Sequence, residues 1–543
     1  MNRSDLRREV AELFIVRASG FNLDSQRLYP NLEESNTSLK RLLEEGVGGV
    51  IFLGGTVKEL EIRCNILKKW SGKRLLLCAD IEEGVGQRFH GGTKFIPPMG
   101  IAQIYKKDHH LGISIAEKIG YFTAKEAKNI GLNWLLAPVC DINNNSNNPV
   151  INLRAWGEEA ETVKSLTCAF QRGVSRSKIL TCAKHFPGHG NSEVDSHLDL
   201  PEIHNDLSEL EKFELIPFES LINQGVNSVM IGHLLFPKID PIYPATLSKR
   251  LVTELLRIKF NYDGLIVSDA LVMNAISNKY SSGKAAVMAF DAGIDLIMMP
   301  KNIDEAIDSL TDAFYSGKIS LERLRMSRER RKKQLDLISN ENDLEEKFRH
   351  EDVKNKFLVD AYRFSNSIIK NSICVRGEIT IKAKVNDINL IQIDNFDQVS
   401  NKLFPALNLP EAVGFRNLII HPLGISPWQN SNKRFLELAR IGNGKILVQL
   451  FVRGKPFIGS EYHNDHWIDV IKNLEIEERL LGIIIYGCPY LYDKIKKTIH
   501  EAIPLAYSPS QIEQAQTQIL NRILPSKIVQ KKVDEKSSKE FTD

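Results

Sequence analysis

Five ionisable side chains fall within fourteen consecutive residues near the middle of the chain: Lys184, His185, His189, Asp195 and His197. They lie at and just beyond the end of a short apolar run that is typical of a buried strand. A proline and two glycines then interrupt the strand pattern and lead into a polar loop. Because active sites in α/β proteins are built at the carboxyl ends of strands, this stretch predicts a cleft lined by these side chains.

The same residues fit a metal site, a Schiff-base lysine or a purely structural role. Histidine nitrogens and the Asp195 carboxylate could bind a metal, but the spacing contains neither HxxxH nor HxH, and we expect no metal and no cofactor. Lys184 could trap a carbonyl substrate, as in an aldolase-like barrel. Histidines that only bind loop carbonyls would each need a buried partner, which is disfavoured for five ionisable groups so close together.

Acid–base and nucleophilic chemistry on a glycoside also fits. Such chemistry needs a proton donor and, in a retaining enzyme, a carboxylate nucleophile. Residues i and i+2 of an extended loop point the same way, so Asp195 can orient His197 and stabilise its imidazolium. Asp269 ends the apolar run 265–267 and could supply the nucleophile, although an isolated aspartate at a strand end could instead cap the next helix.

The first 300 residues contain eight short apolar runs that alternate with segments of helical spacing. This alternation predicts a (β/α)8 TIM-like barrel, in which polar groups should gather at the strand ends. Asp80, Asp141, His233 and Asp269 each follow such a run. The predicted strands are Leu13–Val16, Val47–Leu53, Leu75–Ala79, Leu132–Val139, Ile179–Ala183, Val226–Ile231, Leu265–Val267 and Ile294–Met299.

A change in composition after the barrel predicts a second domain. We expect the barrel to occupy residues 1–337, a polar linker 338–350, a smaller α/β/α sandwich 351–524 and a disordered charged tail 525–543. Apolar runs with helical segments between several of them predict the sandwich strands. These runs are Ile388–Ile393, Leu418–Ile420, Ile446–Phe451, Gly482–Ile485 and Ile503–Ala506.

Sequence motifs along most of the chain resemble one enzyme family. KHFPGHG at 184–190, followed by DSH at 195–197, resembles the signature of the β-N-acetylglucosaminidase branch of glycoside hydrolase family 3. SDAL at 268–271 resembles the family's nucleophile strand, and 80–88 and 141–157 resemble its sugar-binding loops. In the C-terminal part, YGCPY at 486–490 and AYS at 506–508 resemble the family's sandwich domain.

The resemblance implies a retaining exo-β-N-acetylglucosaminidase without a cofactor. Asp269 would attack the anomeric carbon, while His197, paired with Asp195, would act as acid and base. The implied substrate is a small oligosaccharide or muropeptide from peptidoglycan. The terminal sugar would be held by Asp80, Arg88, Arg154, Lys184 and His185.

Other functions remain open at this stage. Phosphate could replace water as the acceptor, since a histidine does not repel it as a carboxylate would. A family 3 β-glucosidase, the aldolase-like barrel and a non-catalytic sugar-binding protein are further alternatives. Trp156, in the second sugar-binding loop, is expected to pack inside the loop and not to serve as a platform for a sugar.

Composition limits the partners and the compartment. A net charge of +3 over 543 residues gives no reason to expect nucleic acid or a membrane as a partner. No apolar run reaches the length of a membrane span, and no secretory signal is recognisable. The seven cysteines are odd in number and scattered, which favours a reducing compartment, and we expect a cytoplasmic protein. The sequence does not define the oligomeric state.

Overall fold

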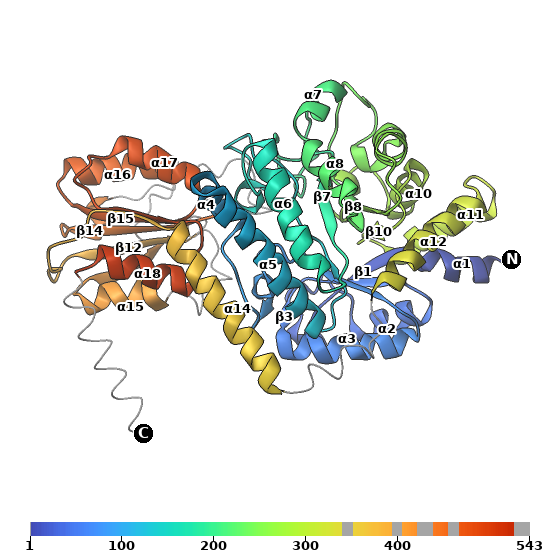
Figure 1. Ribbon diagram of the computed structural model, residues 1–543, viewed down its shortest axis with the longest axis horizontal. Helices are drawn as coiled ribbons and strands as arrows, with labels where there is room; N and C mark the ends of the chain where they lie inside the picture. The colour runs from blue at the N-terminus through green and yellow to red at the C-terminus, as the bar shows by residue number, and fades with distance from the viewer. Residues whose placement is uncertain (1, 339–350, 394–403, 421–437, 454–465, 526–543) are drawn as a thin grey trace. The chain divides into compact units, whose positions relative to one another are not determined.

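The computed structural model describes residues 2–338, 351–393, 404–420, 438–453 and 466–525. It divides into two compact units, one built on residues up to Arg363 and the other on residues from Phe364 onward (Figure 1). The predicted linker beyond Ile338 and the predicted charged tail beyond residue 525 lie outside the described residues.

The first unit is a closed barrel of parallel strands. Hydrogen-bonded pairing is continuous from β10 through β1, β2 and β4 to β6, and again from β7 through β8 to β9. Parallel bridges join Trp134 of β6 to Leu180, two residues before β7, and Val267 of β9 to Leu296, directly before β10, so the ring closes. Each predicted barrel strand overlaps an observed one, and the barrel prediction is confirmed. The strands are β1 (Phe14–Ala18), β2 (Gly49–Phe52), β4 (Leu76–Ala79), β6 (Trp134–Leu135), β7 (Cys182–Phe186), β8 (Ser228–Ile231), β9 (Leu265–Ser268) and β10 (Ile297–Met298).

Helices follow the strands and cover the outside of the barrel (Figure 1). Several begin at a serine, threonine or asparagine whose side chain accepts a hydrogen bond from the first turn, as Ser35, Thr56 and Asn302 do. The helical segments are α1 (Arg3–Ala11), α2 (Asn36–Glu44), α3 (Val57–Ser71), α4 (Pro98–Lys107), α5 (His109–Asn129), α6 (Ala160–Ser175), α7 (Leu207–Lys212), α8 (Ile216–Asn223), η5 (Arg250–Lys259), α9 (Asn274–Ser277), α10 (Ser282–Ala292), α11 (Ile303–Tyr315) and α12 (Leu321–Leu337).

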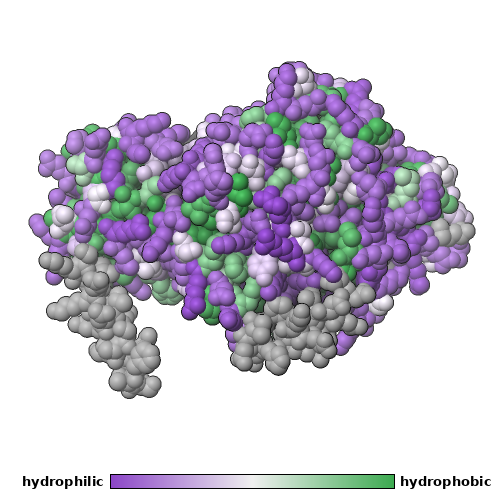
Figure 2. Space-filling view, in the orientation of Figure 1, coloured by the Kyte–Doolittle hydropathy of each residue, from purple (hydrophilic) through white to green (hydrophobic). Residues whose placement is uncertain are grey.

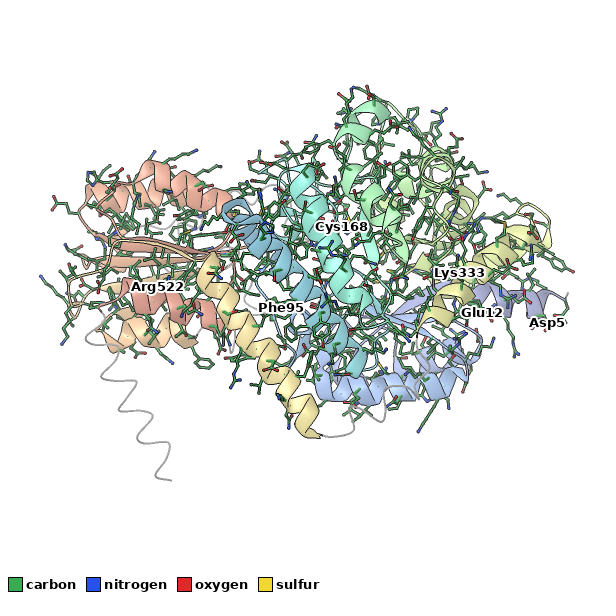
Figure 3. All side chains as sticks on the ribbon, viewed as in Figure 1. Asp5, Glu12, Phe95, Cys168, Lys333 and Arg522 are labelled. Atoms are coloured by element: carbon green, nitrogen blue, oxygen red, sulfur yellow. The ribbon has the colours of Figure 1, made fainter. Side chains whose placement is uncertain are left out.

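The charged helix α12 anchors the amino-terminal end of the barrel. Asp295, which precedes β10 and is fully buried, accepts hydrogen bonds from Arg257 (2.6 Å), Ser327 (2.6 Å) and Arg323 (3.1 Å). Arg328 of the same helix reaches Glu12 at the end of α1 (3.1 Å), and Figure 3 labels Glu12 beside the helix that carries Lys333. These bonds tie the last helix of the barrel to its first, at the end opposite the strand carboxyl termini.

The second unit is an α/β/α sandwich. Its sheet has the order β11-β16-β15-β14-β12-β13, and all pairs are parallel except β11 with β16. Helices α16 and α17 cover one face, and α15 and α18 the other (Figure 1). The elements are β11 (Cys374–Arg376), β12 (Ile388–Ile393), α15 (Phe404–Ala412), β13 (Arg416–Ile420), β14 (Ile446–Val452), α16 (His466–Ile476), β15 (Leu480–Gly487), α17 (Pro489–Thr498), β16 (Leu505–Ser508) and α18 (Glu513–Ile523), preceded by α14 (Glu351–Ser372).

All five predicted sandwich strands overlap observed strands, but β11 was not predicted. Its three residues are only partly buried and show no apolar run, so the sequence carried little strand signal there. The fold as a whole is the predicted barrel followed by a smaller sandwich.

Hydrophilic side chains dominate the face drawn in Figure 2, with apolar residues in small patches on both units. Of the helices in the described residues, none combines the length and the apolar character that crossing a membrane would require.

Candidate active site

Polar side chains gather at the carboxyl ends of the barrel strands. Asp80 directly follows β4, Lys184 and His185 lie in β7, and Asp269 directly follows β9. His233 comes two residues after β8. Because the carboxyl ends of parallel strands meet at one end of a barrel, the strands deliver all these groups to the same face.

Lys184 is held between two carboxylates. Its Nζ lies 2.7 Å from Asp80 Oδ1 and 2.8 Å from Glu82 Oε1, and the side chain is 1% exposed. Burial favours the neutral amine, but the two carboxylates outweigh it and raise the pKa of Lys184. The lysine is therefore a cation, and a Schiff base, which needs a neutral amine as nucleophile, is disfavoured.

Glu82 also pairs with Arg154, which lies on the short helix η3 (Asn152–Arg154). Two parallel hydrogen bonds join them, from Nε to Oε2 (2.9 Å) and from Nη2 to Oε1 (2.8 Å). Although burial opposes ionisation, Arg154 and Lys184 hold the pKa of Glu82 well below its usual range. The bidentate pair fixes the plane of the guanidinium.

The loop after β4 adds Arg88 to this network. Its Nε donates to the Asp80 carbonyl oxygen (3.2 Å), and Nη2 lies 3.5 Å from Asp80 Oδ2. The Gln87 side chain accepts hydrogen bonds from the backbone N–H of Glu82 (2.6 Å) and Glu83 (2.9 Å), which holds the loop closed. Gly84 has φ +87°, and a Cβ there would lie 2.5 Å from the Thr93 carbonyl oxygen, so the turn requires glycine.

Asp141, two residues past Val139, which bridges to Lys184 of β7, organises His185 and His189. Its carboxylate accepts from His185 Nδ1 (2.7 Å) and from the backbone N–H of His189 (2.7 Å). Asp141 is fully buried, which opposes its charge, yet His185 and these hydrogen bonds keep its pKa low. A carboxylate can only accept, so His185 carries its proton on Nδ1.

Asp195 and His197 form the predicted dyad within the loop that follows β7. Asp195 Oδ1 accepts from the backbone N–H of His197 (2.8 Å) and lies 2.9 Å from His197 Nδ1. The Asp195 side chain is fully buried, whereas that of His197 is 21% exposed. The aspartate thus fixes the ring, and the ring reaches solvent.

Asp269 is a deprotonated carboxylate at the end of β9. Burial alone would raise its pKa, but the electrostatic influence of His233, His185 and His197, together with the Ala270 N–H at 2.7 Å, lowers the pKa to about 2.

His233 holds the turn after Asp269. Its Nε2 lies 3.1 Å from the Ala270 carbonyl oxygen and its Nδ1 2.7 Å from Thr246 Oγ1. Burial lowers the pKa of His233, so the ring is neutral at neutral pH, with Nε2–H as the donor to Ala270.

The structure brings Asp80, Arg88, Arg154 and Lys184 into one network. Glu82, which completes it, was not among the predicted site residues, although its position two residues past Asp80 was a signal that could have found it. Trp156 is 1% exposed and packs on Phe170 at 5.5 Å between ring centroids, as predicted. Among the described residues, no three His, Cys, Asp or Glu side chains cluster as metal ligands would.

Models of two protein-family domains match the chain. The model of the glycosyl hydrolase family 3 N-terminal domain matches residues 5–332. The chain belongs to glycosyl hydrolase family 3. The model of the bacterial family 3 C-terminal domain matches residues 380–525, so the predicted two-domain form is also confirmed.

Several curated proteins similar to this chain are called β-hexosaminidases. β-Hexosaminidase A of Pseudoalteromonas piscicida is 33% identical over 276 residues, 47% of this chain and 46% of that protein. The β-hexosaminidase of Chromobacterium violaceum is 33% identical over 270 residues, 49% of this chain and 75% of its own length. That of Neisseria meningitidis serogroup A is 35% identical over 286 residues, 51% and 77% respectively. The chain thus spans less than half of the first protein and about three quarters of the other two.

Solved structures agree on the family 3 fold. The β-N-acetylglucosaminidase of Paenibacillus sp. str. FPU-7 superposes with a TM-score of 0.72 over 95% of both chains, at 24% identity, and supports the fold alone. NagZ of Neisseria gonorrhoeae gives a TM-score of 0.53 at 26% identity, covering 66% of this chain and 97% of its own.

Proposed function

We propose that this family 3 glycoside hydrolase is a retaining exo-β-N-acetylglucosaminidase that removes terminal β-linked N-acetylglucosamine. The observation that carries the proposal is the pairing of Asp195 with His197 at the same barrel end as the ionised Asp269. A proton donor and a carboxylate nucleophile are the two groups that double displacement needs.

In the first step Asp269 attacks the anomeric carbon of the terminal sugar. The glycosidic C–O bond breaks, and His197, in its cationic form, gives a proton to the leaving oxygen. A covalent glycosyl ester on Asp269 forms. The buried Asp195 carboxylate beside Nδ1 stabilises the cation before the transfer and fixes which ring nitrogen faces the substrate.

In the second step His197, now neutral, takes a proton from water. As it loses this proton, the water oxygen attacks the anomeric carbon from the face that the leaving group occupied. The ester bond to Asp269 breaks, and Asp269 departs as a carboxylate. The low pKa of Asp269 makes it a good leaving group in this step and keeps it ionised before the first. Two inversions give overall retention of configuration.

The charged network would hold the sugar. Arg154, Arg88 and Lys184 present N–H donors to hydroxyl and acetamido oxygens, and Asp80 accepts from hydroxyls. His185, whose Nδ1 is bonded to Asp141, keeps Nε2 for a substrate hydroxyl. Since these side chains already bond one another, little reorganisation is needed when the sugar binds.

The names of the relatives support the identity of the sugar that is removed, but they do not indicate the group to which that sugar is attached. Several curated relatives are called β-hexosaminidases, which favours an N-acetylhexosamine over glucose. We propose muropeptides as the natural substrates and the cytoplasm as the compartment. All seven cysteines are free thiols, which fits a reducing environment.

Proton NMR of the first product formed from a β-N-acetylglucosaminide tests the proposal. The β-anomer should appear first and the α-anomer only by later mutarotation. Immediate α-product would exclude double displacement. Repeating the reaction in phosphate buffer separates hydrolysis from phosphorolysis, because a sugar 1-phosphate would identify phosphate as the acceptor.

A further inference from the structure

His189 is a buried histidine to which the proposed mechanism gives no role. It lies in the loop after β7, eight residues before His197, and is 2% exposed. Its backbone is fixed on both sides: the N–H donates to Asp141 (2.7 Å), and the carbonyl oxygen accepts from the buried Asn148 side chain (2.9 Å). The backbone that carries the ring is therefore fixed to Asp141 and Asn148.

The ring reaches across to the loop that carries the dyad. His189 Nε2 lies 3.0 Å from Ser196 Oγ, and Ser196 is the residue between Asp195 and His197. Ser196 is 2% exposed, so water does not compete freely for this hydrogen bond. A bond at this place connects the dyad directly to the segment that Asp141 organises.

The ring is neutral when it makes this bond. Burial lowers the pKa of His189 to about 4, while Asp141 is already engaged by His185. The other ring nitrogen, Nδ1, is buried and has no hydrogen-bond partner among the described residues. An apolar side chain would avoid that cost, so the hydrogen bond to Ser196 is the feature that a histidine adds here.

We propose that the hydrogen bond between His189 and Ser196 is a latch that holds the Asp195–His197 loop in place for proton transfer, which makes His189 and Ser196 positioning residues. This inference rests on the proposed function, because it assigns them a role in aligning His197 with the glycosidic oxygen. Small errors in such alignment cost rate without affecting the binding of the sugar.

Ser196→Ala is the direct test, with Ser192→Ala as its matched control. Ser192 lies in the same loop with the same 2% exposure. Within the described part of the chain its hydroxyl bonds only to Val194, by donating to the carbonyl oxygen (2.8 Å) and accepting from the N–H (3.1 Å). Ser196→Ala should lower kcat by roughly tenfold, a fraction of what general acid–base catalysis contributes. Because the 4-nitrophenyl leaving group needs little protonation, the slowed step is breakdown of the glycosyl ester, so KM should fall together with kcat. Ser192→Ala should match wild type.

Azide distinguishes a misplaced base from a damaged fold. Azide needs no deprotonation before it attacks the glycosyl ester, so it should restore turnover of 4-nitrophenyl N-acetyl-β-glucosaminide in Ser196→Ala and His189→Phe, with glycosyl azide as the product. Loss of folded protein would lower all rates equally and would not respond to azide. The double variant should be no slower than the slower single variant.

His197→Ala measured beside these variants separates the two proposals. If His197→Ala is impaired and rescued by azide while Ser196→Ala behaves as wild type, the latch is wrong and the acid/base assignment stands. If His197→Ala itself is unimpaired, His197 is not the acid and base, and the proposed function is contradicted together with the latch that rests on it.

Discussion

At the scale of single residues, the negative charge of Glu82 compensates the positive charges of Arg154 and Lys184 in the site. One buried carboxylate faces two buried cations, Arg154 through two hydrogen bonds and Lys184 at 2.8 Å. Taking all three charges out of water is costly, and only their mutual attraction offsets it. The arrangement holds the cations in place before a substrate arrives, and its cost makes it sensitive to the loss of any member.

Replacing Glu82 by glutamine should therefore destabilise the barrel. An amide does not neutralise Arg154 and Lys184, so the free energy of unfolding should fall by about 3 kcal/mol, as when one partner is removed from a buried pair. Urea denaturation measures this change. Glu158→Gln is the control, because Glu158 pairs with Lys106 at 2.8 Å on the surface and should contribute about 1 kcal/mol or less. Equal effects of the two substitutions would contradict the buried network.

At the scale of secondary-structure elements, the packing of the loops determines where the catalytic side chains lie. The strands end in the site residues, but the dyad lies nine to eleven residues past β7 and depends on how that loop packs. Gly190 shows how closely this loop approaches its neighbour, because a Cβ at this position would lie 1.7 Å from the Ile142 carbonyl oxygen. The loop backbone thus lies directly against the segment that follows β6.

Gly190→Ala should push this loop away from its place. A displacement of about 1 Å in a catalytic group costs on the order of 100-fold in rate, so kcat should fall by that order. Gly72→Ala is the control: Gly72 ends α3 with φ +62° and open space around it, so alanine there should cost roughly 1–2 kcal/mol of stability without changing the rate per folded molecule. Normal kcat in Gly190→Ala would mean that the loop is not held by this contact.

Much at this scale could be predicted from the sequence, and the exceptions have physical reasons. Buried parallel strands appear in a sequence as apolar runs, so the barrel strands could be recognised. β11 is a short, partly exposed edge strand without such a run, and it could not be recognised. Asp195 and His197 are neighbours in sequence, and their pairing could be anticipated. The Glu82–Arg154 pair joins residues 72 positions apart, and only the closed barrel brings them together.

Protonation couples the site to stability at the scale of the whole molecule. The pKa of His189 falls from 6.5 to about 4 on folding because the charged ring is disfavoured when buried. Between these values the unfolded chain binds a proton that the folded protein does not, so stability rises with pH across this window and is lost as pH falls through it. Ionised carboxylates such as Glu82 and Asp141, with lowered pKa values, add a further loss at lower pH.

His189→Phe isolates the histidine contribution. Between about pH 7 and about pH 4, wild type should lose roughly 3 kcal/mol more unfolding free energy than the variant, because each pKa unit corresponds to about 1.4 kcal/mol. Urea denaturation at a series of pH values gives both curves. Parallel curves would show that His189 is not buried in its neutral form.

The measurement that tests the central claim most directly is nitrophenol release from 4-nitrophenyl N-acetyl-β-glucosaminide and from the matching glucoside. Wild type should turn over the N-acetylated substrate and not the glucoside. Asp269→Ala should abolish this activity, and His197→Ala should reduce it by roughly 100-fold or more, as expected for loss of a general acid and base. Full activity of folded Asp269→Ala would contradict the account, as would the absence of turnover by folded wild type.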